Sequence, residues 1–89
     1  MEVKLELPLR LAKATGRKLS VSVGEKATVR DVLLAALDEE AYRSVVKDGS
    51  VAPGMLVLLN ERDVRVLDGL DTKVREGDVV TVLSVAHGG

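Results

Sequence analysis

The C-terminal residues His87, Gly88 and Gly89 have the types and spacing best suited to chemistry in this chain. Gly89 carries the terminal carboxylate, which is a poor electrophile at neutral pH until it receives a better leaving group. Glycine suits such a reaction because, without a Cβ, it can pass through a narrow channel in an extended conformation and leave its carbonyl carbon open to attack. We therefore expect Gly89 and Gly88 to form a reactive C-terminus. The alternative is a frayed end made of small residues.

His87 is the only histidine, and three roles are open to it. It lacks a second histidine or a cysteine as a metal co-ligand, and Asp78 and Glu76 do not stand at a known ligand spacing. General-base catalysis is a second possibility. The role we favour is that of a polar residue at the exit of the sheet, which contacts a partner together with Ala86 and Val85. We expect no metal site and no catalytic residue in this chain.

The composition limits the possible partners. Eighty-nine residues suit one small domain, and 13 basic against 14 acidic side chains give a net charge of -1, without a basic stripe for nucleic acid. Tyr42 is the only aromatic residue, so bases have no stacking platform. The N-terminus resembles no signal peptide and no apolar run is long enough for a membrane span, which predicts a soluble cytoplasmic protein. Charged residues make up 30% of the chain and glutamine is absent, a bias typical of thermophiles.

The elements that must position the tail follow from periodicity. Residues 1–7 alternate between charged and apolar side chains and predict a half-buried strand; residues 8–16 form a connection, and 18–23 a second strand in an antiparallel hairpin. Thr28 and Asp31 resemble a capping pair for an amphipathic helix, whose apolar stripe is Val29, Val32, Leu33, Ala36 and Leu37. That helix either continues toward Gly49 or breaks and restarts near Ala41. Its stripe should pack on a sheet face that includes Leu5 and Val21.

The second half of the chain predicts three more strands, at 55–60, 63–67 and 79–86, with a tight connection at Glu61 and Arg62 and a loop over 68–78. The last strand alternates poorly, so we expect it at the centre of the sheet, parallel to the first strand. Its apolar residues either fill the core or leave one sheet face open as a docking patch.

This pattern resembles the β-grasp superfamily, which contains ubiquitin and the sulfur carriers of molybdopterin and thiamine biosynthesis. The stretch "VAPGMLVLLNERDVRVLDGLDTKVREGDVVTVLSVAHGG" is similar to the ubiquitin-related modifier, and "PLRLAKATG" is similar to a loop of the bacterial carriers. The resemblance implies an α+β fold, with a mixed sheet of about five strands on one main helix in the order β-β-α-β-β-β. Residues 1–86 would form a single domain and residues 87–89 a flexible reactive tail.

The resemblance also implies a function. An adenylating enzyme would use ATP to activate the Gly89 carboxylate, so this chain itself needs no cofactor. Because cysteine is absent, carried sulfur could only take the form of a thiocarboxylate on Gly89, supplied by a sulfur donor. We expect a monomer that donates sulfur for tRNA thiolation and is able to form isopeptide bonds with lysines of target proteins. The alternatives are the small subunit of molybdopterin synthase and a non-covalent ubiquitin-like adaptor. No feature ranks the six lysines as acceptors of a second copy: Lys4, Lys13, Lys18, Lys26, Lys47 and Lys73.

Overall fold

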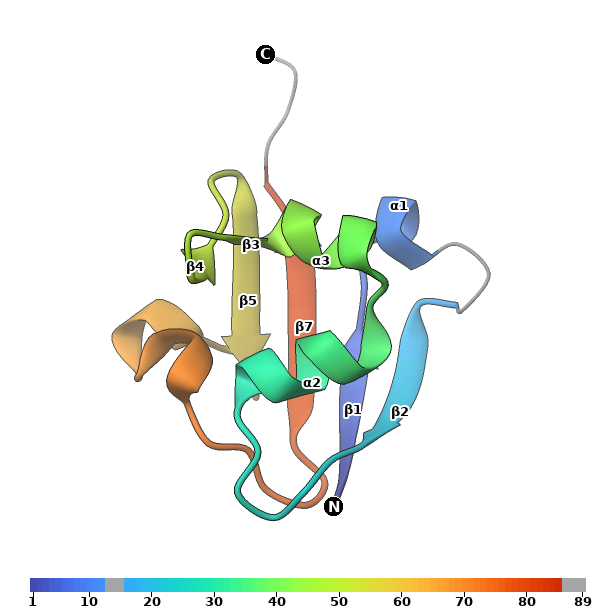
Figure 1. Cartoon of the computed structure of the whole chain (residues 1–89), viewed down its shortest axis with the longest axis vertical. Coiled ribbons are helices and arrows are strands. Elements are labelled where there is room, and N and C mark those ends of the chain that lie inside the picture. Colours follow the sequence, from blue (N-terminus) through green and yellow to red (C-terminus); the bar gives the residue numbers. More distant parts are fainter. Residues whose placement is uncertain (13–15, 86–89) are drawn as a thin grey trace.

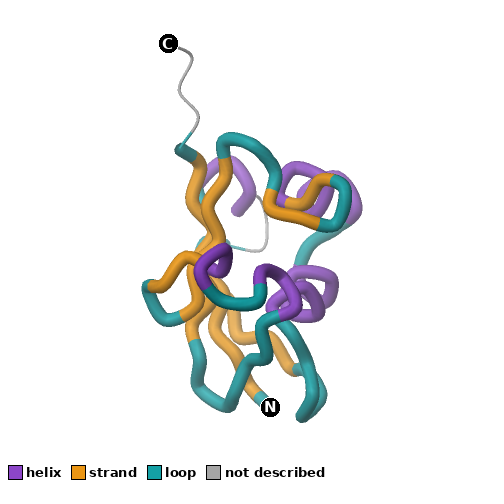
Figure 2. Tube along the Cα trace, turned by 90° about the vertical axis from the view of Figure 1, so that its left-hand side faces the viewer, coloured by secondary structure: helices purple, strands orange, loops and turns teal. Residues whose placement is uncertain are grey.

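The computed structural model describes residues 1–12 and 16–85, and shows a mixed sheet with helices packed on one side (Figures 1 and 2). In chain order, the strands and helices are β1 (Glu2–Glu6), α1 (Leu9–Ala12), β2 (Lys18–Ser22), α2 (Val29–Ala36), α3 (Glu39–Val45), β3 (Val46–Lys47), β4 (Ser50–Val51), β5 (Met55–Leu59), β6 (Arg62–Asp63), the 3-10 helices η2 (Val64–Val66) and η3 (Gly69–Asp71), and β7 (Val79–Ser84). The predicted α+β class and β-grasp architecture are confirmed.

The main sheet has the strand order β2-β1-β7-β5-β6. β1 pairs antiparallel with β2, as the predicted hairpin requires, and parallel with β7, where Lys4 lies opposite Val79. β5 pairs antiparallel with both β7 and β6. The last strand is therefore central and parallel to the first, as predicted.

Alternation assigns each strand residue to one of two faces. In β1, Val3 and Leu5 are buried against the helices, while Glu2 and Lys4 point to solvent. β7 follows the same rule despite its apolar composition, since Val80 and Val82 are buried and Leu83 is exposed. The helix-facing side of the sheet thus belongs to the core, and the opposite face stays open to solvent.

The predicted capping box begins α2. The Thr28 hydroxyl accepts a hydrogen bond from the Asp31 N–H, and the Asp31 carboxylate accepts one from the Thr28 N–H. The helix ends where Leu37 becomes extended, and Asp38 then caps α3 by accepting from the Ala41 N–H. Of the two possibilities left open by the sequence, the helix therefore breaks and restarts.

The predicted core stripe is confirmed in its centre. Val32 and Leu33 are fully buried, as is Leu5, and Val21 is nearly so. Leu37 is only partly buried because it lies at the end of α2, where the chain leaves the helix. Leu37 and Ala36 thus pack against the core, as the stripe predicts, but are not enclosed by it.

Three local predictions need correction. The connection over 8–16 contains α1, which starts after Pro8. Gly49 does not end a helix; it follows Asp48 in a tight turn between β3 and β4, and both residues have positive φ. The tight turn after β5 is at Asn60 and Glu61, one residue earlier than expected.

The predicted strand over 63–67 is also wrong, since only Arg62–Asp63 pair with β5. The Asp63 carboxylate accepts a hydrogen bond from the Arg65 N–H and begins the 3-10 helix η2 instead. Val64 is buried and Val66 is 70% exposed. The alternation in "DVRVL" therefore belongs to one turn of 3-10 helix that packs Val64 on the core, and not to a strand.

Candidate functional site

The described chain ends just after the central strand, β7. Figure 1 shows the C-terminal end of β7 at the same end of the molecule as α1, opposite the N-terminus. Ser84 lies opposite Met55, and the Val85 N–H donates a 2.8 Å hydrogen bond to the Gly54 carbonyl. β1 and β5, which flank β7, and this last hydrogen bond therefore fix the point at which the chain leaves the sheet.

The turn before β5 supplies that last contact. The Met55 N–H donates to the Ala52 carbonyl across Pro53 and Gly54, and Gly54 has φ +83°. Proline followed by a residue with positive φ is typical of a type II turn, in which glycine is strongly favoured at the second central position. The "PG" pair, which the sequence presents only as punctuation, thus positions the carbonyl that holds Val85.

The solvent-facing side of β5 and β7 carries an apolar surface next to the tail. Leu56 lies opposite Leu83, and Leu58 opposite Thr81, so these side chains share one face. Leu83 is 39% exposed and Val85 43% exposed. We call Leu56, Leu58, Leu83 and Val85 the outer apolar strip. The sequence leaves a docking patch open as an alternative, but "MLVLL" is apolar at every position and so does not indicate which residues face solvent.

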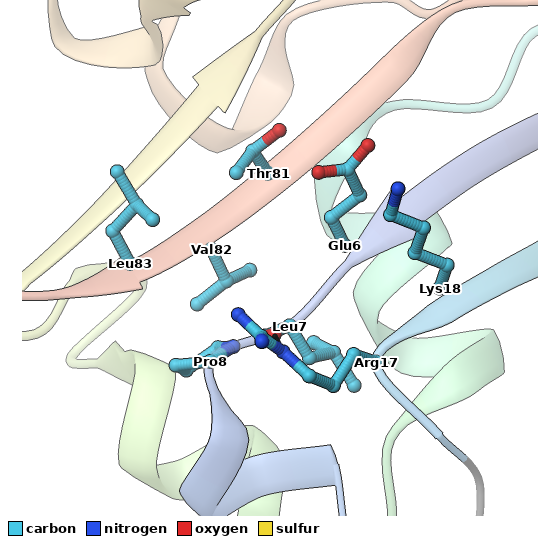
Figure 3. A pocket seen from close by; sticks show the side chains of 8 residues that line it. All are labelled: Glu6, Leu7, Pro8, Arg17, Lys18, Thr81, Val82 and Leu83. Atoms are coloured by element: carbon cyan, nitrogen blue, oxygen red, sulfur yellow. Dashed lines mark hydrogen bonds between the residues drawn. The ribbon is translucent and has the colours of Figure 1, made fainter.

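A hollow of about 280 Å³ adjoins this strip where β1, β2 and β7 meet (Figure 3). Figure 3 shows Glu6, Lys18 and Thr81 on one side, with the Arg17 side chain lying toward Pro8 and Val82. Arg17 Nε donates to the Leu7 carbonyl at 3.4 Å. A partner that covers the strip would thus meet charged groups of both signs beside apolar side chains.

The described residues contain no group of three His, Cys, Asp or Glu side chains that could hold a metal ion. The titratable groups with shifted pKa values belong to exposed pairs. Hydrogen bonds from the Arg65 side chain and backbone lower the pKa of Asp63, and the hydrogen bond to Asp71 raises the pKa of Arg30. Arg30 also donates to the Gly49 carbonyl at 3.0 Å. Arg30 thus joins α2 to η3 and to the turn between β3 and β4, and neither pair includes a residue of β7.

The structure describes only part of the predicted site. Val85 is exposed immediately after the central strand, and its contact with a partner stays a prediction. Ala86, His87, Gly88 and Gly89 lie outside the described residues, as does the predicted boundary between the domain and its tail. Their roles stay predictions.

Separately, no helix within residues 1–12 and 16–85 is long and apolar enough to cross a membrane.

The family model of Urm1, the ubiquitin-related modifier, matches residues 3–89. The chain belongs to the Urm1 family. The small archaeal modifier protein 3 of Haloferax volcanii is 36% identical over 92 residues, with both chains covered completely. This Urm1-family chain therefore belongs to a family of ubiquitin-related modifiers and sulfur carriers.

Solved structures agree with this assignment. The small archaeal modifier protein 1 of Methanosarcina acetivorans has a TM-score of 0.77 and is 30% identical, covering 99% of this chain and 96% of that one. A chain in the Amycolatopsis orientalis BexX/CysO complex has a TM-score of 0.82 and is 26% identical, covering 98% of this chain and 99% of that one. The resemblance to the ubiquitin-related modifier and the β-grasp fold is therefore confirmed.

Proposed function

We propose that this Urm1-family protein carries sulfur as a thiocarboxylate on Gly89, after an activating enzyme has adenylated the Gly89 carboxylate with ATP. The observation that carries the proposal is the position of β7. This strand is central, its end is held by Met55 and Gly54, and in the sequence only Val85 and Ala86 separate it from "HGG". A terminus that must enter another protein's active site benefits from a rigid starting point.

The outer apolar strip is the proposed docking surface for the activating enzyme. Leu83 and Val85 are exposed beside the start of the tail, and the hollow with Arg17, Lys18 and Glu6 adds charged contacts. Apolar centres with polar rims are typical of protein interfaces. A partner bound there would lie close to the residues that must reach its ATP. ATP therefore belongs to the partner in this proposal, and this chain needs no cofactor of its own.

The chemistry needs two displacements. A Gly89 carboxylate oxygen attacks the α-phosphorus of ATP and expels pyrophosphate, which gives an acyl-adenylate. A sulfur nucleophile, hydrosulfide in the simplest case, then attacks the acyl carbon, and AMP leaves with the bonding electron pair. One carboxylate oxygen is thus replaced by sulfur without a change in oxidation state. Because the chain has no cysteine, the carboxyl terminus is the position in this protein that can hold the sulfur.

The same acyl-adenylate reacts with an amine as well as with sulfur. A target lysine that displaces AMP would form an isopeptide bond, so protein modification is a second use of one activated terminus. Membership in the Urm1 family supports tRNA, rather than molybdopterin, as the acceptor of the sulfur.

The decisive measurement is the intact mass of the protein isolated from its own cells. We expect a species heavier by the difference between sulfur and oxygen, located at the C-terminal peptide. Deletion of Gly88 and Gly89 should abolish this species and tRNA thiolation, while the free energy of unfolding stays within about 0.5 kcal/mol of the parent. A truncated protein that still supports thiolation would contradict the proposal and favour the non-covalent adaptor.

Two substitutions separate activation from docking. Gly89→Val places a β-branched side chain beside the reacting carbon, so ATP–pyrophosphate exchange should fall while binding to the activating enzyme persists. Leu83→Asp should weaken that binding, because it puts a charge in the outer apolar strip. The matched control is Leu34→Asp on α2, where the parent side chain is 53% exposed on the helix side of the sheet. Equal effects of the two aspartates would rule out the strip as the docking surface.

A further inference from the structure

β2 forms a free edge of the main sheet. It is the terminal strand in the order β2-β1-β7-β5-β6, and Figure 1 shows no strand beyond it. An edge strand has one row of backbone groups paired with its neighbour and a second row pointing away. The hydrogen-bond register identifies which residues make up each row.

The odd-numbered residues of this segment pair with β1. Met1 and Val23 exchange two hydrogen bonds, from the terminal amine to the Val23 carbonyl at 2.7 Å and from the Val23 N–H to the Met1 carbonyl at 2.9 Å. At the other end, the Leu7 N–H donates to the Arg17 carbonyl at 2.8 Å. Since hydrogen-bonded pairs alternate along an antiparallel ladder, the N–H and C=O groups of Lys18, Ser20 and Ser22 point away from β1.

These three residues are exposed, and no described residue forms a backbone hydrogen bond with their outward groups. Unpaired N–H and C=O groups in strand register match the backbone of another extended segment. Above this edge, a shallow groove of about 430 Å³ separates the end of β2 from α2, with Val23, Ala27 and Ala35 among its lining residues. A strand added to β2 would direct every second side chain toward this groove.

The charges along the edge indicate the kind of strand that fits. Lys18 and Lys26 have no ion-pair partner among the described residues. Among the nearby acids, Glu2 is bonded to the Ser22 hydroxyl and Asp31 to Thr28 at the start of α2. Glu6 lies opposite Lys18 in the pairing of β1 with β2 but forms no ion pair with it, so Lys18 can still accept a carboxylate from a partner. Antiparallel pairing of β2 with β2 of a second copy about Ser20 would place Lys18 opposite Ser22, so Lys18 would gain no carboxylate directly opposite it.

We propose that the β2 edge binds an extended, acidic segment of a partner protein by strand addition. Apolar side chains of that segment face the groove beside α2, and its carboxylates face Lys18 on the open side of the sheet. The edge lies two strands away from β7, so a partner held here leaves the outer apolar strip and the tail accessible. The edge is thus a second interaction surface, which shares Arg17 and Lys18 with the hollow beside the outer apolar strip but includes no residue of β7.

The test uses the full chain and a synthetic peptide of alternating glutamate and valine, Ac-EVEVEVE-NH2. In ¹⁵N-resolved NMR titrations, the amides of Ser20 and Ser22 should shift and become protected from hydrogen exchange. Ser20→Pro removes one outward N–H and should weaken binding about tenfold, whereas the matched variant Ser20→Ala keeps that N–H and should bind like the parent. Lys18→Glu should weaken binding, and the same charge change at Lys47, in β3, should not.

A second probe avoids changes to the protein, in case Ser20→Pro perturbs the fold. Methylation of the peptide nitrogens that would face β2 should abolish binding, while methylation of the alternate nitrogens should leave it intact. The proposal is overturned if the peptide does not bind, if both methylated forms bind equally, or if the shifted amides surround the hollow beside Thr81. It is also overturned if Ser20 and Ser22 become protected with rising protein concentration alone, because β2 would then pair with a second copy.

Discussion

Leu33 in α2 offers the sharpest test of how the helix packs on the sheet. Its side chain is fully buried, while its neighbour Leu34 on the same helix is 53% exposed. The substitutions Leu33→Ala and Leu34→Ala remove identical atoms and change helix propensity equally. Any difference between the two variants therefore measures burial of the side chain against the sheet.

The expected magnitude follows from the atoms removed. Leucine to alanine deletes three carbons, and at about 0.8 kcal/mol per buried methylene the loss of transfer free energy is about 2.4 kcal/mol. A residual cavity of roughly 50 Å³ adds about 1.2 kcal/mol. Leu33→Ala should thus lower the free energy of unfolding by about 3.5 kcal/mol, and Leu34→Ala by less than about 0.5 kcal/mol.

Urea unfolding monitored by far-ultraviolet circular dichroism suits this protein, which lacks tryptophan and has a single tyrosine. With an m-value near 1.2 kcal/mol/M, the midpoint for Leu33→Ala should fall by about 3 M relative to the parent. Leu37→Ala should fall between the two variants, because Leu37 is partly buried at the helix end. If Leu33→Ala and Leu34→Ala had equal midpoints, the packing of α2 described here would be wrong.

Two further predictions concern polar groups. Thr28→Ala removes the hydroxyl half of the α2 capping box and should cost about 1 kcal/mol in the free energy of unfolding, whereas Thr28→Ser should cost little; equal losses would show that the hydroxyl does not cap the helix. Hydrogen bonds from the Arg65 side chain, and then from its backbone N–H, lower the pKa of Asp63. The ionised carboxylate therefore stabilises the fold at pH values above its usual pKa of 3.8. That contribution is lost as the pH falls through the lower pKa of the folded state. The free energy of unfolding should therefore decrease less steeply with falling pH in Asp63→Asn than in the parent. Identical curves of unfolding free energy against pH would contradict the assignment.

The sequence predicts most of the sheet because its signals are local and repeated. The alternation of Val3, Leu5 and Leu7 identifies β1 without knowledge of its neighbours, and the continuous apolarity of residues 79–83 correctly indicates a central strand. The capping pair at Thr28 and Asp31 likewise gives the start of α2. In each case, the residues whose pattern gives the prediction are themselves the residues of the predicted element.

Errors arose where one local signal fitted two structures. Asp48-Gly49 is typical of a hairpin turn, but the helical pattern before it made Gly49 resemble a helix end. The alternation of "DVRVL" fitted a strand until Asp63 was found to accept the Arg65 N–H and start η2. The sequence left open whether the apolar residues of the last strand fill the core or form a docking patch, because Leu56 and Leu83 are brought opposite each other only by the pairing of β5 with β7.

The parallel pairing of β1 with β7 also has a consequence for biosynthesis. Lys4 meets Val79, 75 positions further along the chain, so the centre of the sheet forms only after nearly all of the domain has been translated. Closing so long a loop makes folding slower than it would be for a sheet of sequential hairpins. A nascent chain interrupted before β7 would leave β1 and β5 without the strand that joins them, and would expose its apolar face to proteases. Incomplete translation products, which lack the C-terminal residues proposed to react, would therefore be degraded rather than compete with intact chains for the proposed activating enzyme.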